Sequence, residues 1–187
     1  MKRLFDLILS LIAIIIFAIP MIIVALAIKI DSKGPVLFKQ QRAGKNGELF
    51  QIYKFRSMYI EAPNISTDML GDPSLYITPV GRFIRKSSLD ELPQLFNILK
   101  GEMSIVGPRP ALYNQYELIK MREEGNVNTV RPGLTGYAQV MGRDLITDIE
   151  KVSYDRYYVE NQSLIFDFKI IWTTLFNVIK SEGVKMK

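Results

Sequence analysis

The sequence contains neither cysteine nor histidine. Without cysteine the chain forms no disulfide and has no thiolate nucleophile. Without histidine it lacks the commonest general base and metal ligand of proteins, and a zinc site built from these two residue types is excluded. Any catalysis must therefore use carboxylates, lysine, tyrosine or hydroxyl groups.

Glycine-rich phosphate-binding motifs are also missing. The sequence contains neither the P-loop pattern nor the Rossmann G-x-G-x-x-G pattern. It has no internal repeat and no low-complexity tract. At 187 residues we expect one functional unit, in which any nucleotide would be recognised by other means.

Charge is absent from one long segment near the N-terminus. The 22 residues 7–28 carry no charged side chain, and as a helix they would extend about 33 Å, enough to cross a hydrocarbon core. A signal peptide is the alternative, but the run is long for one and lacks a small-x-small cleavage site. Pro20 would kink this helix, which favours a bent, re-entrant helix over a spanning one.

Basic residues are concentrated directly after the apolar segment. Residues 29–60 contain only two acidic residues and seven basic ones: Lys29, Lys33, Lys39, Arg42, Lys45, Lys54 and Arg56. Such an excess fits the cytoplasmic side of a bilayer, where anionic headgroups attract basic side chains. Nucleic acid is the competing partner, and the adjacent apolar segment favours the membrane.

The rest of the chain predicts a small, mostly helical α+β domain. Residues 35–58 form two β-rich runs joined through Lys45-Asn46-Gly47, which predicts a hairpin, and residues 61–79 have loop composition. Helices are expected at 88–99, 112–124, 148–160 and 163–179. The last has a broad apolar face with Trp172 and Phe176, which fits either the core or the headgroup layer of a membrane.

Adjacent carboxylates at Asp90 and Glu91 have two interpretations. In the first, Ser88 caps a helix, Glu91 completes a capping box, and Asp90 favours the positive end of the helix dipole. In the second, the same helix start keeps Asp90 ionised so that it attacks phosphorus and forms an acyl-phosphate. The two are compatible, and Pro93 leaves the start of the helix open.

Three arginines are candidates for binding phosphate. Arg109 lies between two prolines in a stiff Gly-Pro-Arg-Pro segment, and Arg85 and Arg143 lie beside helix-boundary or glycine residues. Each is either an exposed turn residue or a bidentate oxyanion ligand. A pyrophosphate attacked by a carboxylate needs charge neutralisation, and only hard oxygen ligands are at hand, so we expect Mg²⁺ with Asp90 among its ligands.

Six ordered blocks together resemble the small monotopic phosphoglycosyl transferases of the bacterial sugar transferase family. The blocks are KRLFDL, GPVLFKQQRAG, IYKFRSM, SLDELPQLFNILKGEMSIVGPRP, VRPGLTGYAQVMGR and YDRYYV, and they cover nearly the whole chain. The likeness is strongest to the CapM type, which initiates capsule synthesis in Gram-positive bacteria. It implies transfer of a sugar-1-phosphate from a UDP-sugar, here UDP-N-acetyl-D-fucosamine, to undecaprenyl phosphate with release of UMP.

The resemblance also implies roles for individual residues. Asp90 matches the nucleophile and Glu91 its acidic neighbour, which assists proton or metal handling. The further functional positions that the resemblance implies are Lys54, Arg85, Arg109, Arg143 and Asp155. The family's membrane element is a helix broken at Ser-Pro so that it re-enters the cytoplasmic leaflet, and Pro20 matches that proline while Ile19 stands in place of the serine.

These implications predict a protein of the bacterial cytoplasmic membrane, facing the cytoplasm, with both termini on that face. Residues 1–30 would form the re-entrant helix and residues 31–187 the catalytic domain. The expected partners are a UDP-sugar, undecaprenyl phosphate and membrane lipids, and no nucleic acid; a homodimer stays open. The alternatives are a noncatalytic membrane-tethered adaptor and a direct glycosyl transferase that releases UDP.

Overall fold

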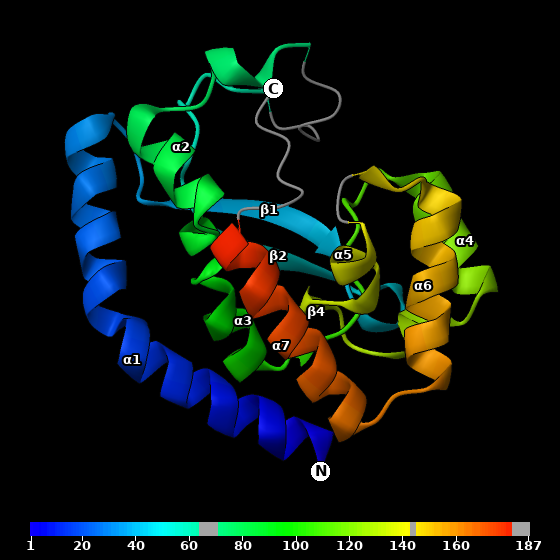
Figure 1. Cartoon of the computed structure of the whole chain (residues 1–187). Coiled ribbons are helices and arrows are strands. Elements are labelled where there is room, and N and C mark those ends of the chain that lie inside the picture. The colour runs from blue at the N-terminus through cyan, green and yellow to red at the C-terminus, as the bar shows by residue number, and fades with distance from the viewer. Residues whose placement is uncertain (64–70, 143–144, 181–187) are drawn as a thin grey trace.

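The computed structural model describes residues 1–63, 71–142 and 145–180, with side chains described as far as residue 178. Among these described residues helices dominate, and the strands form two short pairs (Figure 1). The elements are α1 (Lys2–Asp31), β1 (Leu37–Ala43), η1 (Lys45–Gly47), β2 (Leu49–Phe55), η3 (Pro73–Leu75), α2 (Pro79–Lys86), η4 (Leu89–Glu91), α3 (Gln94–Lys100), β3 (Ser104–Val106), α4 (Tyr116–Glu124), η5 (Val127–Thr129), β4 (Gly133–Thr135), α5 (Tyr137–Met141), α6 (Asp148–Glu160) and α7 (Leu164–Lys180). The α+β fold class is confirmed.

The N-terminal helix α1 is apolar and largely uncovered. Its 30 residues are long and apolar enough to cross a membrane, and only 11% of its most apolar window is buried by the rest of the described chain. Isoleucines cover its outer side; Ile15, for example, is 68% exposed. Pro20 lies inside the helix, and Figure 1 shows α1 changing direction near its middle. This uncovered apolar surface is what a membrane-associated helix presents.

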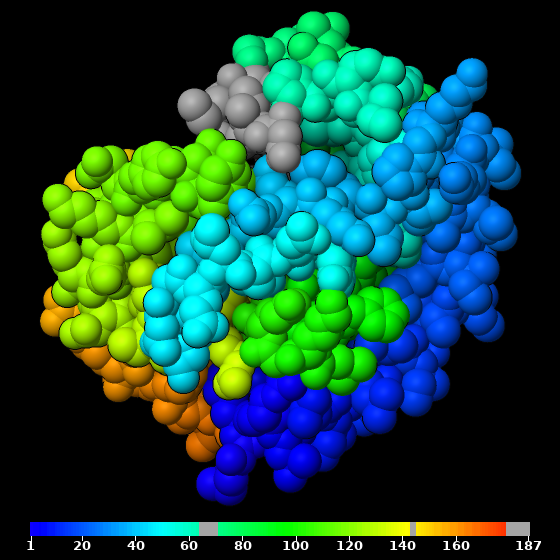
Figure 2. Space-filling model, turned by 180° about the vertical axis from the view of Figure 1, so that it is seen from behind, coloured from blue at the N-terminus to red at the C-terminus, as the bar shows by residue number. Residues whose placement is uncertain are grey.

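The predicted hairpin is confirmed. β1 and β2 pair antiparallel from Leu37 opposite Phe55 to Ala43 opposite Leu49. The connection is the short helical turn η1, in which Asn46 has a positive φ of 54°, a conformation that asparagine tolerates better than most residues. Seen from behind (Figure 2), the hairpin lies across the middle of the molecule, between α1 and the part that carries α4.

The main core lies between the hairpin, α1, α3 and the C-terminal helices. Its buried members, distributed from β2 to α7, are Ile52, Leu95, Ile98, Met103, Ile105, Val106, Tyr158 and Ile170. β3 and β4 form a two-stranded parallel pair, with Ser104 opposite Gly133 and Val106 opposite Thr135. This pair was not predicted, because three-residue strands are too short to show an alternating pattern.

Some of the predicted helices match the structure and others do not. The predictions at 148–160 and 163–179 are confirmed by α6 and α7, whereas the helix expected from residue 112 begins at Tyr116. The single helix expected at 88–99 is wrong: η4 and α3 are separate, and Pro93 stands at the start of α3. The proline ring and missing N–H explain the interruption. Helices α2 and α5 were not predicted.

A buried polar cluster, the α1 anchor, ties the first turns of α1 to the domain. The Asp6 carboxylate accepts hydrogen bonds from the hydroxyl of Ser104 (2.9 and 3.0 Å) and the backbone N–H of Ile105 (3.1 Å). The Nζ of Lys2 donates to Asp167 at 2.7 Å. Asp6 and Asp167 are 2% and 0% exposed, so the anchor fixes α1 against β3 and α7.

The C-terminal helix α7 has one buried side and one exposed aromatic side. Asp167 and Ile170 are buried in the domain. Phe168, Trp172 and Phe176 are exposed on the other side, and the rings of Trp172 and Phe176 touch edge to face. One side of α7 therefore completes the core, and the other presents aromatic surface of the kind found in the headgroup layer.

Candidate active site

Asp90 and Glu91 lie in the turn η4 between α2 and α3. Ser88, which precedes the turn, has a left-handed backbone with φ 55°, and its side chain makes no capping hydrogen bond. The capping-box interpretation of Ser88 and Glu91 is therefore wrong. The backbone N–H of Glu91 instead donates to the carbonyl of Ser88 at 3.2 Å, which leaves the Glu91 side chain available for other partners.

The Glu91 carboxylate is held by two cations from distant segments. Its Oε1 accepts from the Nζ of Lys54 on β2 at 2.7 Å and from Arg109 at 2.8 Å. Burial alone would raise the pKa of Glu91, but the charges and hydrogen bonds of Arg109 and Lys54 outweigh it and hold that pKa well below its usual range. Glu91 is therefore a permanent anion that fixes the two cations.

Asp90 has the opposite electrostatic balance. Burial raises its pKa to about 6, and the Glu91 charge adds to the increase, while Lys54, Arg85 and Arg109 oppose it. The helix start that was expected to keep Asp90 ionised is not at this residue, because Asp90 lies in the turn η4 before α3; with a pKa of about 6 its carboxylate is still mostly ionised at neutral pH. A desolvated carboxylate beside cations is a reactive group placed where a charged substrate could be neutralised.

The cations around the pair are themselves partly desolvated. Burial lowers the pKa of Lys54 against the opposing effect of Glu91. Burial, together with the nearby Arg109, lowers the pKa of Arg42 to about 10. The Arg42 guanidinium donates to the carbonyl of Pro110 (3.1 Å) and to the side chain of Gln40 (2.7 Å). Arg42 thus adds positive charge beside the Gly-Pro-Arg-Pro segment and was not predicted from the sequence as a site residue.

The Arg109 backbone rests on a buried ion pair. The guanidinium of Arg122 donates to the Arg109 carbonyl at 2.7 Å and to the Asp155 carboxylate at 2.6 Å. The side chains of Arg122 and Asp155 are 6% and 1% exposed. Burial raises the pKa of Asp155, with Arg122 opposing. The Arg122–Asp155 pair therefore holds the backbone of the Gly-Pro-Arg-Pro segment, while the Arg109 side chain stays 42% exposed.

Close backbone contacts with β4 also fix the Gly-Pro-Arg-Pro segment. The N–H of Gly133 donates to the carbonyl of Pro108, and the N–H of Gly107 donates to Thr135, both at 2.9 Å. A Cβ on Gly133 would lie 2.1 Å from the nitrogen of Gly107. The approach requires glycine at Gly133, so the sequence blocks around Gly107 and Gly133 form one structural unit that carries Arg109.

The structure brings five predicted site residues into one cluster: Lys54, Arg85, Asp90, Glu91 and Arg109. Asp155 lies behind this cluster and acts on it through Arg122. Pro20 lies in α1. Arg143 falls outside the described residues. Arg122 was missed because a lone arginine in a helix normally indicates a solvated face.

The described residues contain no group of three or more acidic side chains that could hold a metal ion. Mg²⁺ is usually held by one or two carboxylates together with substrate phosphates and water. Asp90 fits the role of one such ligand, because its carboxylate is a hard oxygen donor within the cluster. Glu91 already binds two cations through Oε1.

Comparison with known proteins gives consistent matches. The family model described as bacterial sugar transferase matches residues 1–181. The protein of Bacillus subtilis named uncharacterized sugar transferase EpsL is 39% identical over 185 residues, covering 99% of this chain and 90% of EpsL. The galactosyl transferase CpsE of Streptococcus agalactiae is 39% identical over 198 residues, covering 98% of this chain and 43% of CpsE.

A third relative has a more specific name. The undecaprenyl-phosphate galactose phosphotransferase of Salmonella typhimurium is 38% identical over 201 residues, covering 98% of this chain and 41% of that protein. The chain therefore spans less than half the length of CpsE and of the Salmonella protein, and nearly all of EpsL.

Proposed function

Because this chain belongs to the bacterial sugar transferase family, we propose that it transfers a sugar-1-phosphate from a UDP-sugar to undecaprenyl phosphate. The observation that carries this proposal is the contrast within one turn. The ionised Glu91 carboxylate is paired with Lys54 and Arg109, whereas desolvation raises the pKa of its neighbour Asp90 to about 6. Relatives named as undecaprenyl-phosphate sugar transferases support the substrate classes.

In the first step the Asp90 carboxylate attacks the β-phosphorus of the UDP-sugar. A bond forms between the carboxylate oxygen and phosphorus, and the bond from phosphorus to the bridging oxygen breaks, so that UMP leaves. The sugar phosphate is then an acyl-phosphate on Asp90. Arg109, with its exposed side chain, and Arg85 bind the diphosphate and offset the charge that develops on it.

In the second step the phosphate oxygen of undecaprenyl phosphate attacks the same phosphorus. The acyl-phosphate bond breaks, the Asp90 carboxylate is restored, and the product is a lipid diphosphate sugar. Glu91 serves both steps by holding Lys54 and Arg109 in place. Since the two substrates react in turn, the kinetics are ping-pong.

Mg²⁺ is the proposed cofactor. It would bind with the donor diphosphate, with Asp90 as a protein ligand, and would supply charge neutralisation at the phosphoryl oxygens. The residues of this chain set the remaining requirements: the arginines orient the diphosphate, and Asp90 offers a partly desolvated carboxylate.

We further propose that α1 re-enters the cytoplasmic leaflet of the bacterial cytoplasmic membrane. Pro20 inside the helix, its change of direction in Figure 1, and the anchor at its first turns support this topology. Both termini would then be cytoplasmic. Pro20→Ala restores a helical N–H and should favour the spanning form. A membrane-impermeant label that reacts with an N-terminal tag only from the outer face in the wild type would contradict re-entry.

The activity is tested by identifying the nucleotide released from a panel of UDP-sugars, with UDP-N-acetyl-D-fucosamine among them, by purified protein with Mg²⁺ and undecaprenyl phosphate. We expect UMP, and the best donor identifies the sugar. Release of UDP would instead indicate direct glycosyl transfer. No release with any donor would support the adaptor alternative.

A further inference from the structure

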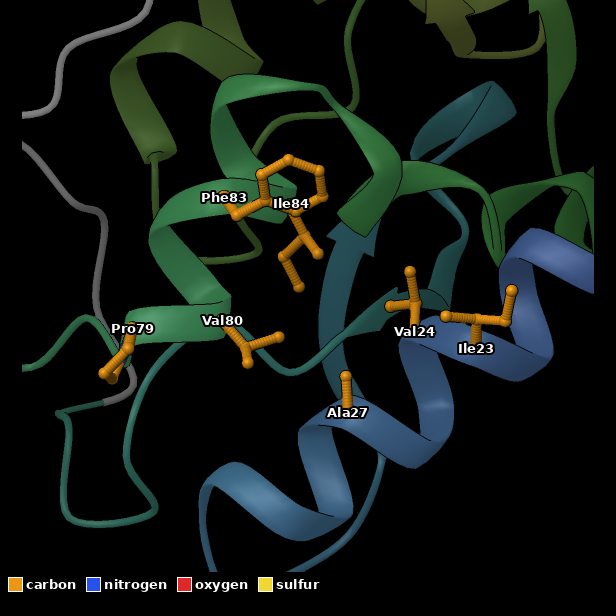
Figure 3. A pocket seen from close by; sticks show the side chains of 7 residues that line it. All are labelled: Ile23, Val24, Ala27, Pro79, Val80, Phe83 and Ile84. Carbon is orange, nitrogen blue, oxygen red and sulfur yellow. The ribbon is translucent and has the colours of Figure 1, made fainter.

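An apolar groove lies between the second half of α1 and helix α2 (Figure 3). Its volume is about 390 Å³, within the size range of ligand-binding clefts. The lining residues are Ile23, Val24, Ala27, Pro79, Val80, Phe83 and Ile84, and all of them are apolar. A groove without a polar lining selects a hydrocarbon and offers nothing to hold a nucleotide or a sugar.

Part of this groove belongs to an apolar cluster that also contains chain neighbours of the active-site residues. Val24 and Ile84 are buried together with Phe55, and Leu89 and Leu92 pack against the same cluster. Phe55 follows Lys54 in β2, and Leu89 and Leu92 flank the Asp90–Glu91 pair directly. One apolar cluster therefore contains residues of the groove together with chain neighbours of the reacting carboxylate.

Positive charge marks the end of the groove nearest the carboxylates. α2 begins at the groove residues Pro79 and Val80 and ends with Arg85 and Lys86 in its last turn. Arg85 is close enough to Asp90 to lower its pKa. A ligand lying along α2 therefore meets hydrocarbon surface first and then cations, which matches an amphiphile with an anionic head.

We infer that this groove binds the isoprenoid chain of the lipid phosphate acceptor next to its phosphate and so aims that phosphate at the sugar phosphate on Asp90. The inference rests on the proposed function. α1 exposes the groove to the hydrocarbon layer through Ile23, which is 60% exposed, so the chain enters sideways from the membrane. A bulk phospholipid fits the apolar lining equally well, and the cluster shared with chain neighbours of the carboxylates favours the acceptor.

The first test fills the groove. Ala27→Trp and Val80→Trp should raise the KM for undecaprenyl phosphate about tenfold or more, because the chain loses its apolar surface, with a much smaller effect on kcat at saturating acceptor. The matched control is Ile15→Trp, which adds the same ring to an exposed position of α1 away from the groove. An unchanged KM in both groove variants would overturn the inference.

The outcomes distinguish failure of the inferred groove from failure of the proposed function. If the wild type releases no UMP from any donor, the proposed function fails. If the wild type turns over and the groove variants match Ile15→Trp, only the inference fails. Thermal unfolding of each variant identifies loss of the fold.

A second test uses the unaltered protein and so does not depend on a variant that folds. A farnesyl phosphate that carries a photoreactive diazirine on its chain should crosslink within residues 23–27 and 79–84, and undecaprenyl phosphate should displace it. Crosslinks elsewhere would overturn the inference. So would a diazirine-bearing phosphatidylglycerol that labels the groove and is not displaced by undecaprenyl phosphate, since bulk lipid would then be the occupant.

Discussion

Two polar regions of this molecule use carboxylates in opposite ways. In the α1 anchor, Asp6 accepts from Ser104 and Ile105, and Asp167 accepts from Lys2 and Tyr158. In the turn η4, Asp90 is partly buried beside cations that do not fully compensate for its desolvation, and its pKa rises to about 6. A buried carboxylate saturated with donors fixes structure, while an undercompensated one is available for chemistry.

The largest expected effect is the loss of activity on substitution of Asp90. Asp90→Asn keeps the shape of the side chain but removes the attacking oxygen anion, so UMP release should fall by about 10³-fold or more. The measurement is UMP release under the conditions of the donor assay. Asp148→Asn, at an exposed position of α6, is the control and should retain activity. An Asp90→Asn protein that releases UMP at a rate near that of the wild type would exclude Asp90 as the nucleophile.

The anchor should show its effect in stability instead. Asp6→Ala leaves the Ser104 hydroxyl and the Ile105 N–H without their buried acceptor, and we expect the free energy of unfolding to decrease by about 2–4 kcal/mol. Denaturant unfolding in detergent measures the change. Glu160→Gln breaks the exposed pair with Arg156 and should cost less than about 1 kcal/mol. Equal effects of the two substitutions would contradict the structural role of the anchor.

A smaller loss of activity is expected from substitution of Arg122, whose buried ion pair supports the loop of the candidate active site. Arg122 connects the buried Asp155 to the Arg109 carbonyl, so Arg122→Gln should loosen the loop that carries Arg109. We expect kcat/KM for the UDP-sugar to fall about 10-fold. Arg122→Lys retains one donor and should recover part of that loss. A loss of thermal stability without any change in donor kinetics would indicate a role in packing alone.

The smallest effect concerns stability as a function of pH in the metal-free protein. The folded-state pKa of Asp90, about 6, is above the ordinary value of 3.8, so its contribution to stability is complete below pH 3.8 and is lost as pH rises through 6. Asp90→Asn should therefore melt at a higher temperature than the wild type at pH 7.5, and the difference should vanish near pH 4. Melting curves at both pH values test this, and a constant difference would argue against the raised pKa.

The hairpin and the long apolar helix were more predictable than the helix boundaries around the carboxylates. The hairpin followed from Asn46-Gly47 between β-rich runs, and α1 from its uncharged length, because both signals are local. The break at Pro93 and the left-handed Ser88 replaced the predicted continuous helix and its capping box. A capping pattern is short, and here the proline in the same segment prevailed over it.

The sequence by itself determined that this chain has an apolar membrane-type helix, a hairpin and a carboxylate pair with basic residues for partners, since composition and local pattern carry that information. Only the tertiary structure decided which of the two carboxylates is held in ion pairs. Lys54, Glu91 and Arg109 are far apart in the chain and meet through folding. It also decided that Arg122 and Asp155 support the site from behind. Burial and charge pairing depend on long-range packing, and no local pattern encodes them.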